Sequence, residues 1–542
     1  MVRQSDRRLT MTFEKLLEQY VAKEDVEEED VRDFFASPNE RVRLVARHAV
    51  AQTAIRDALS AAASLGREQQ YADSTTLSTI ELLAGISDVD EPYAETLKQQ
   101  GLQAVKNGQF ESAMRYLHMT VNRGVLASNQ RAARARRVMR YAYDSETEAA
   151  LDTLARHFSP PRGRPSIDPP LRLVILCSAV QDEDGPTVIT CKSAVHFRNA
   201  GFDVEVVSTE TVVSANSRMS QRLKQLGIPF YPVVGETFEQ KVRWLLSYFD
   251  DCPANAIFST VQVHDMLGKL VGCVGVAPVQ VYGCLTIEPL VGKYDLLIQG
   301  VSARQETQTR WPGRSRYFGT PHAMAEEIDA ARPLSRAALD VPEDAVLFAT
   351  FGRMTKCDKP EYLEALGRIL KAEARAWLVL AGRDDFGVVE SIADYFQRLG
   401  VGARVRYLGR RQQDGPRLLK TIDVYCDPYP WPGGQSLLDA MYAGLPIVAM
   451  RAACDPNLDP TGCGPTSALA EALLDGVVEL APPGGVDDYV RIARAYIADT
   501  ELRARAGRRA RAKVTRDSSM QRWAAKCSEA IGELVLSKAN TS

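Results

Sequence analysis

Beyond residue 171 the sequence alternates between short apolar runs and longer stretches in which apolar residues recur at helical spacing. Runs of this length, without a polar face, are typical of parallel strands that are buried on both sides. Strands that alternate with helices form parallel sheets with helices on both faces. We expect strands at 171–180, 203–208, 230–234, 256–260, 279–282 and 296–299, and a second set at 346–351, 377–381, 405–408, 424–426 and 447–449. The sequence therefore predicts two successive α/β domains.

The first 157 residues have a different pattern. They are rich in Ala, Glu, Arg, Leu and Gln, contain few prolines, and predict an all-α domain. Residues 95–124 predict two antiparallel helices that turn at 106–109, and this hairpin resembles one degenerate tetratricopeptide repeat. Such arrays need about three units to bury a continuous core, so a single hairpin does not establish an array. We interpret the basic segment 130–140 as a solvated helix face in preference to a site for an acidic partner.

Five prolines and a glycine between residues 158 and 170 exclude a continuing helix or strand there. The predicted organisation is a helical domain (1–157), a linker (158–170), a first α/β domain with a crossover (171–342) and a second α/β domain (343–542).

Composition excludes several classes of protein. The 542 residues are 45% hydrophobic and 25% charged, as in ordinary globular proteins, and the net charge of −3 provides no basic field for nucleic acid. No apolar run approaches the roughly 18 residues that span a bilayer, and the first residues do not resemble a secretory signal. We therefore expect a cytoplasmic protein without a membrane span.

The cysteines and histidines do not indicate a metal site. Ten cysteines are present without a C-x-x-C pair, and the six histidines lack ligand spacing. We expect reduced, buried thiols, no metal ion and no cofactor.

The most informative segment is 423–450, DVYCDPYPWPGGQSLLDAMYAGLPIVAM. A buried strand leads into a proline-rich loop, Gly433 and Gly434 allow close backbone approach, and Gln435 and Ser436 begin an amphipathic helix. Free N–H groups and the helix dipole favour an anion at such a helix start. Asp439, one turn further, is placed to accept hydrogen bonds from sugar hydroxyls. The alternative is a tight turn followed by a first-turn carboxylate that only favours the dipole.

This segment resembles the nucleotide-sugar site of GT-B glycosyltransferases. It is most similar to family 41, the O-linked N-acetylglucosamine transferases and bacterial protein glycosyltransferases. In that family the small-residue loop holds the diphosphate, and the helix aspartate binds ribose. The resemblance implies that Gly434, Gln435 and Ser436 meet phosphate, with Gly433 beside them in the substrate site, and that Asp439 meets ribose.

A second motif supports the resemblance. Residues 350–360, TFGRMTKCDKP, follow the first strand of the second domain as N-F-N-Q-x-x-K-x-x-P does in the family. Lys356 falls on the family lysine that neutralises the UDP leaving group, and Arg353 on the same loop can assist. A lone loop lysine is more often solvated, but the helix-start motif further along the chain favours the functional interpretation. Residues 408–413 take the place of the uracil-contacting loop of the family.

Two departures from the family pattern concern the mechanism. Retaining GT-B enzymes usually carry two glutamates eight residues apart, on either side of the glycine loop. In this chain Trp431 and Asp439 occupy these two positions, which favours an inverting mechanism. The H-P-T-x-H loop of the family appears as 185–189, GPTVI, and both histidines are missing. The base is therefore open between Asp184, in an acidic cluster after the first strand, His264, after the fourth, and no side-chain base. Residues 277–283 resemble the A-P-I-Q strand of the family and support the alignment near His264.

The sequence thus predicts a GT-B fold of two tandem Rossmann-like domains after an all-α, tetratricopeptide-like domain. The resemblance implies a hexosyl- or N-acetylhexosaminyltransferase that is inverting and metal-independent. It would use a UDP-sugar donor and a protein or glycan acceptor. The helical domain would orient the acceptor, or join copies or a partner subunit. Two alternatives stay open: a non-catalytic glycosyltransferase-like subunit, and a UDP-sugar epimerase on the same fold.

Overall fold

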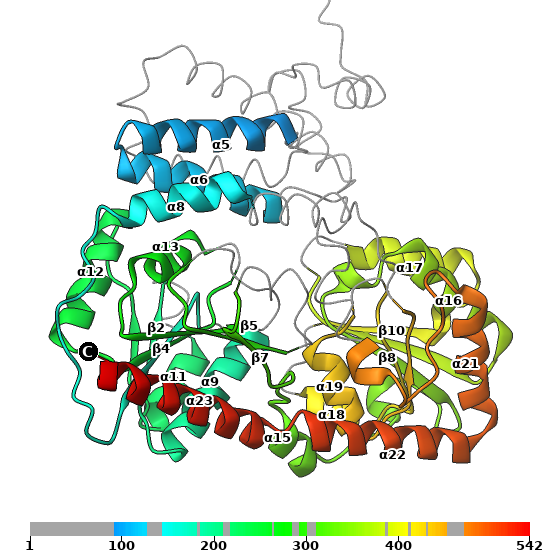
Figure 1. Ribbon diagram of the computed structural model, residues 1–542. Helices are drawn as coiled ribbons and strands as arrows, with labels where there is room; N and C mark the ends of the chain where they lie inside the picture. Colours follow the sequence, from blue (N-terminus) through cyan, green and yellow to red (C-terminus); the bar gives the residue numbers. More distant parts are fainter. Residues whose placement is uncertain are drawn as a thin grey trace, which may run out of the picture. The chain divides into compact units, whose positions relative to one another are not determined.

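The computed structural model describes residues 91–126, 144–180, 185–209, 217–262, 265–284, 292–300, 311–384, 388–409, 414–429, 432–451 and 471–541. Two parallel sheets with helices on both faces make up most of this part of the chain (Figure 1). The predicted pair of Rossmann-like domains is therefore confirmed.

The first sheet has seven strands in the order β3-β2-β1-β4-β5-β6-β7. Leu173 of β1 pairs with Val204 of β2 on one side and with Ala256 of β4 on the other. The chain moves outward from β1 and then returns to its other side, so the strand order reverses between β1 and β4, where doubly wound sheets bind ligands. The strands are β1 (Arg172–Cys177), β2 (Asp203–Ser208), β3 (Phe230–Pro232), β4 (Ala256–Ser259), β5 (Val279–Cys284), β6 (Leu296–Gln299) and β7 (Ser315–Tyr317).

Five helices cover the two faces of the first sheet (Figure 1). They are α9 (Gly185–Asn199), α11 (Arg218–Gln225) and α23 (Met520–Thr541) on one face, and α12 (Phe238–Asp251) and α13 (Met266–Val274) on the other. An aromatic cluster joins α9 and α23 to the sheet: the ring centroids of Phe197 and Phe258 are 5.2 Å apart, and those of Phe258 and Trp523 are 5.9 Å apart.

The second sheet has five strands in the order β10-β9-β8-β11-β12, which again reverses beside the first strand of the domain. Two hydrophobic clusters cover its faces, one beneath α16, α17 and α21 and the other beneath α18, α19 and α22. The strands are β8 (Val346–Phe351), β9 (Ala376–Ala381), β10 (Val405–Gly409), β11 (Val424–Cys426) and β12 (Ile447–Val448). The helices are α16 (Pro360–Ala372), α17 (Val388–Arg398), α18 (Gly415–Leu419), α19 (Gln435–Tyr442), α21 (Val486–Ala498) and α22 (Thr500–Asp517), with short 3₁₀ turns η2 (Met354–Lys356) and η3 (Gly402–Arg404).

The C-terminal helix α23 packs on the first sheet although it follows the second in the chain. Its buried residues Trp523, Cys527 and Ile531 recur every four positions and enter the core of the first sheet. The sequence analysis assigned 343–542 to one domain, because helical spacing reveals an apolar face without showing which sheet it covers. The packing places α23 with the first domain instead.

Each predicted strand is present, and the crossover contains two elements that the sequence analysis did not predict. These are β7 (Ser315–Tyr317) and α15 (Ala325–Ala330), followed by the 3₁₀ turn η1 (Ala337–Leu339). β7 is an edge strand, and two of its three residues, Arg316 and Tyr317, are exposed. An exposed edge strand needs no apolar run, so the sequence carries little signal for it.

Only part of the predicted helical domain, residues 1–157, lies within the described residues. The hairpin predicted at 95–124 is present as α5 (Glu91–Lys106) and α6 (Phe110–Leu126), with Gly108 at φ 70° in the turn. A β-carbon at Gly101 would lie 2.9 Å from Leu117, so a small residue is required where the two helices cross. A third helix, α8 (Ser145–Ala155), precedes the linker. Residues 1–90 and the basic segment 130–140 lie outside the described residues, and the tetratricopeptide likeness stays a prediction.

The cysteines of the described residues are consistent with the expectation of buried thiols. Seven cysteines in the described residues form no disulfide, and six of these are buried. Cys252 alone among them is exposed.

Candidate functional site

The residues predicted to bind substrate gather at the carboxyl ends of β8 and β11. These two strands are neighbours, with Val424 paired to Phe348 and Tyr425 to Ala349, although they are separated by two other strands in the chain. The strand order reverses between them, which is where doubly wound sheets leave room for a ligand. The loop after β8 carries Lys356, and the loop after β11 leads to the glycine turn.

The glycine turn is built for close backbone approach. A β-carbon at Gly433 would lie 2.4 Å from the Tyr425 hydroxyl oxygen and 2.6 Å from Ser436 Oγ. Gly434 has φ 62° and ψ −117°, a conformation that only glycine adopts readily, and it is the N-cap of α19. No hydrogen-bond partner for the backbone N–H groups of Gly434, Gln435 and Ser436 occurs within the described part of the chain. These three backbone N–H groups at the turn and the helix start can therefore donate hydrogen bonds to a ligand.

Ser436 ties this turn to the end of β8. Its hydroxyl lies 3.1 Å from the carbonyl oxygen of Phe351 and 2.9 Å from that of Gly433, and 3.2 Å from the Tyr425 hydroxyl. The predicted phosphate contact of this side chain therefore requires the hydroxyl to accept a hydrogen bond or to leave these carbonyls.

Lys356 reaches the same turn from the other loop. Its ammonium group donates to the carbonyl oxygen of Pro432 at 2.6 Å. Burial lowers the pKa of Lys356, whereas the nearby Asp427 carboxylate raises it and Arg353 lowers it. Arg353 lies three residues before Lys356 and is exposed. A cation and the free N–H groups of a helix start thus surround one position, as an anionic group requires.

Asp427 is a site residue that the sequence analysis did not single out. It directly follows β11, is 2% exposed, and accepts the backbone N–H of Gly433 at 2.9 Å. Burial raises its pKa to about 7, against the lowering effects of the Gly433 N–H, Lys356 and Tyr425. Carboxyl groups with strongly shifted pKa values cluster at functional sites, so the raised pKa of Asp427 beside the glycine turn supports a functional site there. In the sequence, Asp427 is distinguished only by its position directly after a predicted strand.

Asp439 lies in α19 next to a histidine from the crossover. Its Oδ1 is 2.9 Å from Nε2 of His322, and its side chain is 20% exposed. Burial raises the pKa of Asp439, and His322 lowers it. Asp439 is the fifth residue of α19, and the first turn of this helix contains no acidic residue, so the alternative of a first-turn carboxylate is wrong.

Gln435 connects the helix start to the first domain. Its amide nitrogen donates to the carbonyl oxygen of Pro321 at 2.9 Å, and its Cγ is 3.8 Å from the position of a β-carbon on Gly185. Its Oε1 is buried without a hydrogen-bond partner among the described residues. Gly185 begins α9, so the loop after β1 ends beside α19.

The predicted bases Asp184 and His264 lie outside the described residues. They belong to the connections after β1 and β4, the two strands at which the order of the first sheet reverses. Two described hydrogen bonds lie near these connections: Thr209 Oγ1, just after β2, donates to Asp265 at 2.5 Å, and Gln262 N donates to Ser178 Oγ at 2.8 Å. Asp265 also caps α13 by accepting the N–H of Gly268 at 2.8 Å. Both oxygens of Asp265 are therefore engaged in the fold.

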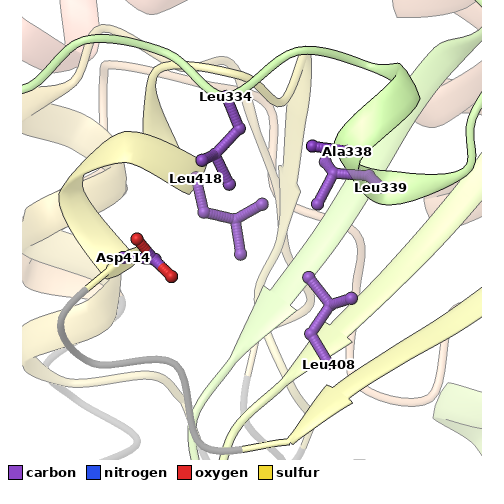
Figure 2. Close-up of a pocket in the computed structure, with 6 residues that line it drawn as sticks. All are labelled: Leu334, Ala338, Leu339, Leu408, Asp414 and Leu418. Carbon is purple, nitrogen blue, oxygen red and sulfur yellow. The ribbon is translucent and has the colours of Figure 1, made fainter.

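A small apolar cavity lies where the end of the crossover packs against the second domain (Figure 2). Its volume is about 70 Å³, and it is lined by Leu334, Ala338, Leu339, Leu408, Asp414 and Leu418. Leu408 and Asp414 flank the predicted uracil-contacting loop, of which residues 410–413 are not described. A nucleotide needs several hundred Å³, and none of the residues of the glycine turn lines this cavity, so it is not the donor site.

Two further points concern the part of the chain that the structure describes. No helix there is long and apolar enough to cross a membrane. No group of three His, Cys, Asp or Glu side chains in that part of the chain is arranged to hold a metal ion.

Residues 345–481 match the family model described as glycosyl transferases group 1. This region contains Lys356, the glycine turn and Asp439. No curated protein matches the chain.

Solved structures of glycosyltransferases share the fold. A mutant O-GlcNAc transferase from Thermobaculum terrenum is 17% identical, with 100% of both chains covered and a TM-score of 0.54. HepE from Anabaena, in complex with UDP and glucose, is 17% identical over 67% of this chain and 100% of its own, with a TM-score of 0.51. A glycosyltransferase from Rickettsia africae is 9% identical over 68% of this chain and 99% of its own, with a TM-score of 0.53. The predicted GT-B fold is thereby confirmed, and the match to the glycosyl transferases group 1 model covers residues 345–481.

Proposed function

We propose that the chain transfers a sugar from a UDP-sugar to a protein or glycan acceptor. The observation that carries this proposal is the meeting of Lys356, the glycine turn and Asp439 at the strand-order reversal of the second sheet. A cation and a helix start suit a diphosphate, and a carboxylate beyond them suits the hydroxyls of a ribose.

Lys356 has the central role in the proposed reaction. Its ammonium group donates a hydrogen bond to the Pro432 carbonyl oxygen, 2.6 Å away. A diphosphate at the turn offers a stronger, charged acceptor, so Lys356 exchanges the carbonyl for a phosphate oxygen. As the bond to the sugar breaks, negative charge develops on the UDP leaving group, and Lys356 with the N–H groups of Gly434, Gln435 and Ser436 stabilises it. This arrangement supports a metal-independent reaction, with Arg353 as a further cation.

The acceptor side of the proposal depends on the first domain. Inversion requires the acceptor to attack opposite the leaving group, with a base within hydrogen-bond reach of its proton. We propose Asp184 or His264 for this role, since both belong to connections at the strand-order reversal of the first sheet. The position of Gln435 supports a shared site, because a β-carbon on Gly185, at the start of α9, would lie 3.8 Å from Gln435 Cγ on the donor helix.

The choice of donor draws on the similar structures. One of them is an O-GlcNAc transferase, and another is in complex with UDP and glucose. We therefore propose UDP as the nucleotide and a hexose or N-acetylhexosamine as the sugar. Cytoplasmic location, and assembly through the helical domain, stay predictions.

A donor screen tests the proposal. Thermal unfolding is measured with UDP-, GDP- and TDP-sugars, because a donor that binds the native state raises its melting temperature by mass action. We expect stabilisation by UDP-sugars. Stabilisation by GDP- or TDP-sugars alone would contradict the assignment of UDP, and no stabilisation by any of them would contradict a nucleotide-sugar site.

Product analysis then separates the reactions. Release of free sugar from a UDP-sugar, or transfer to an added protein or glycan, supports a transferase. Conversion of the donor to its epimer without an acceptor identifies an epimerase. Binding with neither reaction identifies a non-catalytic subunit.

A further inference from the structure

His322 joins three segments that are far apart in the sequence. It lies in the crossover between β7 and α15, and its backbone N–H donates to the carbonyl oxygen of Ser518 at 2.7 Å. It also forms a parallel bridge with Ser519, at the junction of α22 and α23. Its side chain reaches the third segment, α19. The backbone of His322 is thus held independently of the helix that its side chain contacts.

The side chain of His322 is enclosed. The residue is 3% exposed, and its ring centroid lies 4.7 Å from that of Tyr442, one turn beyond Asp439 in α19. Tyr442 is held in turn, because its hydroxyl donates to Asp329 at 2.7 Å and the Arg511 guanidinium lies 4.6 Å from its ring centroid. Packing against Tyr442 therefore holds the plane of the imidazole, and Nε2 is directed at Asp439.

The contact between His322 and Asp439 has a definite chemistry. When the Asp439 carboxylate is ionised it can only accept hydrogen bonds, and Nε2 of His322 is then the donor in the 2.9 Å contact with Oδ1. The side chain of Asp439 keeps 20% exposure, whereas that of His322 has 2%. The exposed part of the pair is thus the carboxylate, and the buried imidazole supports it from behind. This is the arrangement by which a second residue orients a ligand-binding group.

We propose that His322 is a positioning residue of the donor site, which holds Oδ1 of Asp439 so that Oδ2 meets the ribose hydroxyls of the nucleotide. This inference rests on the proposed function, since it takes Asp439 as the ribose ligand. His322 itself does not touch the nucleotide. Its contribution is to orient the carboxylate and to keep it ionised in a buried place, where a carboxyl group without a donor would take up a proton.

Two substitutions separate the hydrogen bond from the packing. His322→Phe keeps a ring against Tyr442 and removes the donor. His322→Gln loses the ring but places an amide nitrogen the same number of bonds from Cβ as Nε2. Calorimetry of the full chain with UDP is expected to give roughly ten-fold weaker binding for His322→Phe, and binding within about three-fold of the wild type for His322→Gln. His322→Asn, one bond shorter, is expected to behave like His322→Phe and provides the comparison if the phenylalanine variant does not fold.

Two readouts distinguish positioning from a merely structural role. The preference for UDP over its 2′-deoxy and 3′-deoxy analogues is expected to fall in His322→Phe, because the misplaced carboxylate no longer discriminates ribose hydroxyls. In an Asp439→Asn background His322→Phe is expected to cause little further loss of UDP affinity, since the two residues act through one contact. Tyr442→Phe is the control, because it keeps the ring and removes only the bond to Asp329.

The outcomes are distinguishable. Equal losses from His322→Phe with and without Asp439→Asn, or a loss in His322→Gln as large as in His322→Phe, would overturn the positioning role while leaving the donor site intact. Failure of the wild-type chain to bind UDP would overturn the proposed function, and this inference with it.

Discussion

Asp265 at the carboxyl end of the first sheet and Asp439 at that of the second use their carboxylates in different ways. At the first sheet, Asp265 has both oxygens engaged, one with Thr209 and one with the N–H of Gly268 at the start of α13. At the second sheet, Asp439 bonds His322 through Oδ1 and keeps part of its side chain exposed. Both are acidic residues near the start of a helix and at the end of a parallel sheet. The difference is whether the fold consumes the carboxylate or leaves part of it for a ligand.

Backbone groups show the same contrast. In the second sheet the start of α19 follows a glycine turn, and the N–H groups of Gly434, Gln435 and Ser436 have no partner among the described residues. In the first sheet the cap of α13 is satisfied by its own aspartate. A helix start that lacks a side-chain cap, next to a lysine, is prepared for an anion from outside the chain. Position at a strand end therefore does not identify a site residue by itself. What distinguishes a site residue is a hydrogen-bonding group that the fold leaves without a partner.

Loss of Lys356 is expected to have the largest effect. Lys356→Ala removes the cation that we propose stabilises the leaving group, so transfer from a UDP-sugar should fall by about 100-fold or more. Initial rates with a saturating acceptor, together with calorimetry with UDP, measure the change. Lys371→Ala, an exposed lysine in the last turn of α16, is the matched control and should behave as the wild type. Unchanged UDP binding and turnover in Lys356→Ala would show that the second sheet is no more specialised than the first.

The buried carboxyl group of Asp427 predicts a pH dependence of stability. Because burial raises its pKa to about 7, the folded state holds this proton more tightly than the unfolded chain. Stability from this group is complete below the unfolded pKa near 4 and is lost as the pH rises through about 7. Asp427→Asn has no such proton, so its free energy of unfolding relative to the wild type should rise by roughly 2 kcal/mol between pH 5 and pH 8.

Urea denaturation of both proteins at the two pH values measures this difference. Asp344→Asn, at an exposed position of the same domain, is expected to have the same effect at both pH values. A difference between Asp427→Asn and wild type that does not change with pH would mean that Asp427 is as fully compensated as Asp265.

The glycine turn can be tested through its backbone alone. A β-carbon at Gly434 would lie within 4 Å of no other atom. The loss of stability in Gly434→Ala therefore comes from forcing alanine to φ 62° and ψ −117°. We expect a loss of about 1–3 kcal/mol in the free energy of unfolding, or a displaced helix start with weaker UDP binding. Gly415→Ala in α18 also meets no atom within 4 Å and has an ordinary negative φ, so it should be neutral or slightly stabilising. Similar behaviour of the two variants would remove the backbone argument for this turn.

The smallest effect is expected at the first sheet. Asp265→Ala removes the cap of α13 and the partner of Thr209, and should lower the free energy of unfolding by about 1–2 kcal/mol. UDP affinity at a temperature where the variant is folded should not change. Calorimetry with UDP and thermal unfolding of the same preparation give both quantities. A marked loss of UDP affinity with unchanged stability would place Asp265 in the site and contradict its structural role.

Strand positions and the donor motif could be predicted because their signals are local. Strands buried on both faces are apolar throughout, so β2, β6, β8 and β11 begin and end at the predicted residues. A glycine pair before an amphipathic helix, and a lysine shortly after a strand, are likewise visible within a few residues. The structure brings these two segments together, since Lys356 donates to Pro432, the residue before the glycine pair.

The sequence by itself thus determined the α/β architecture, the glycine turn and the candidate cation. Only the tertiary structure decided which sheet α23 covers, that Asp427 is buried behind the turn, and that His322 meets Asp439 across 117 residues of chain. The physical reason is that periodicity records burial and backbone conformation, which depend on near neighbours. The identity of a contact partner and the free energy of burying a charge depend on segments that only folding brings into proximity.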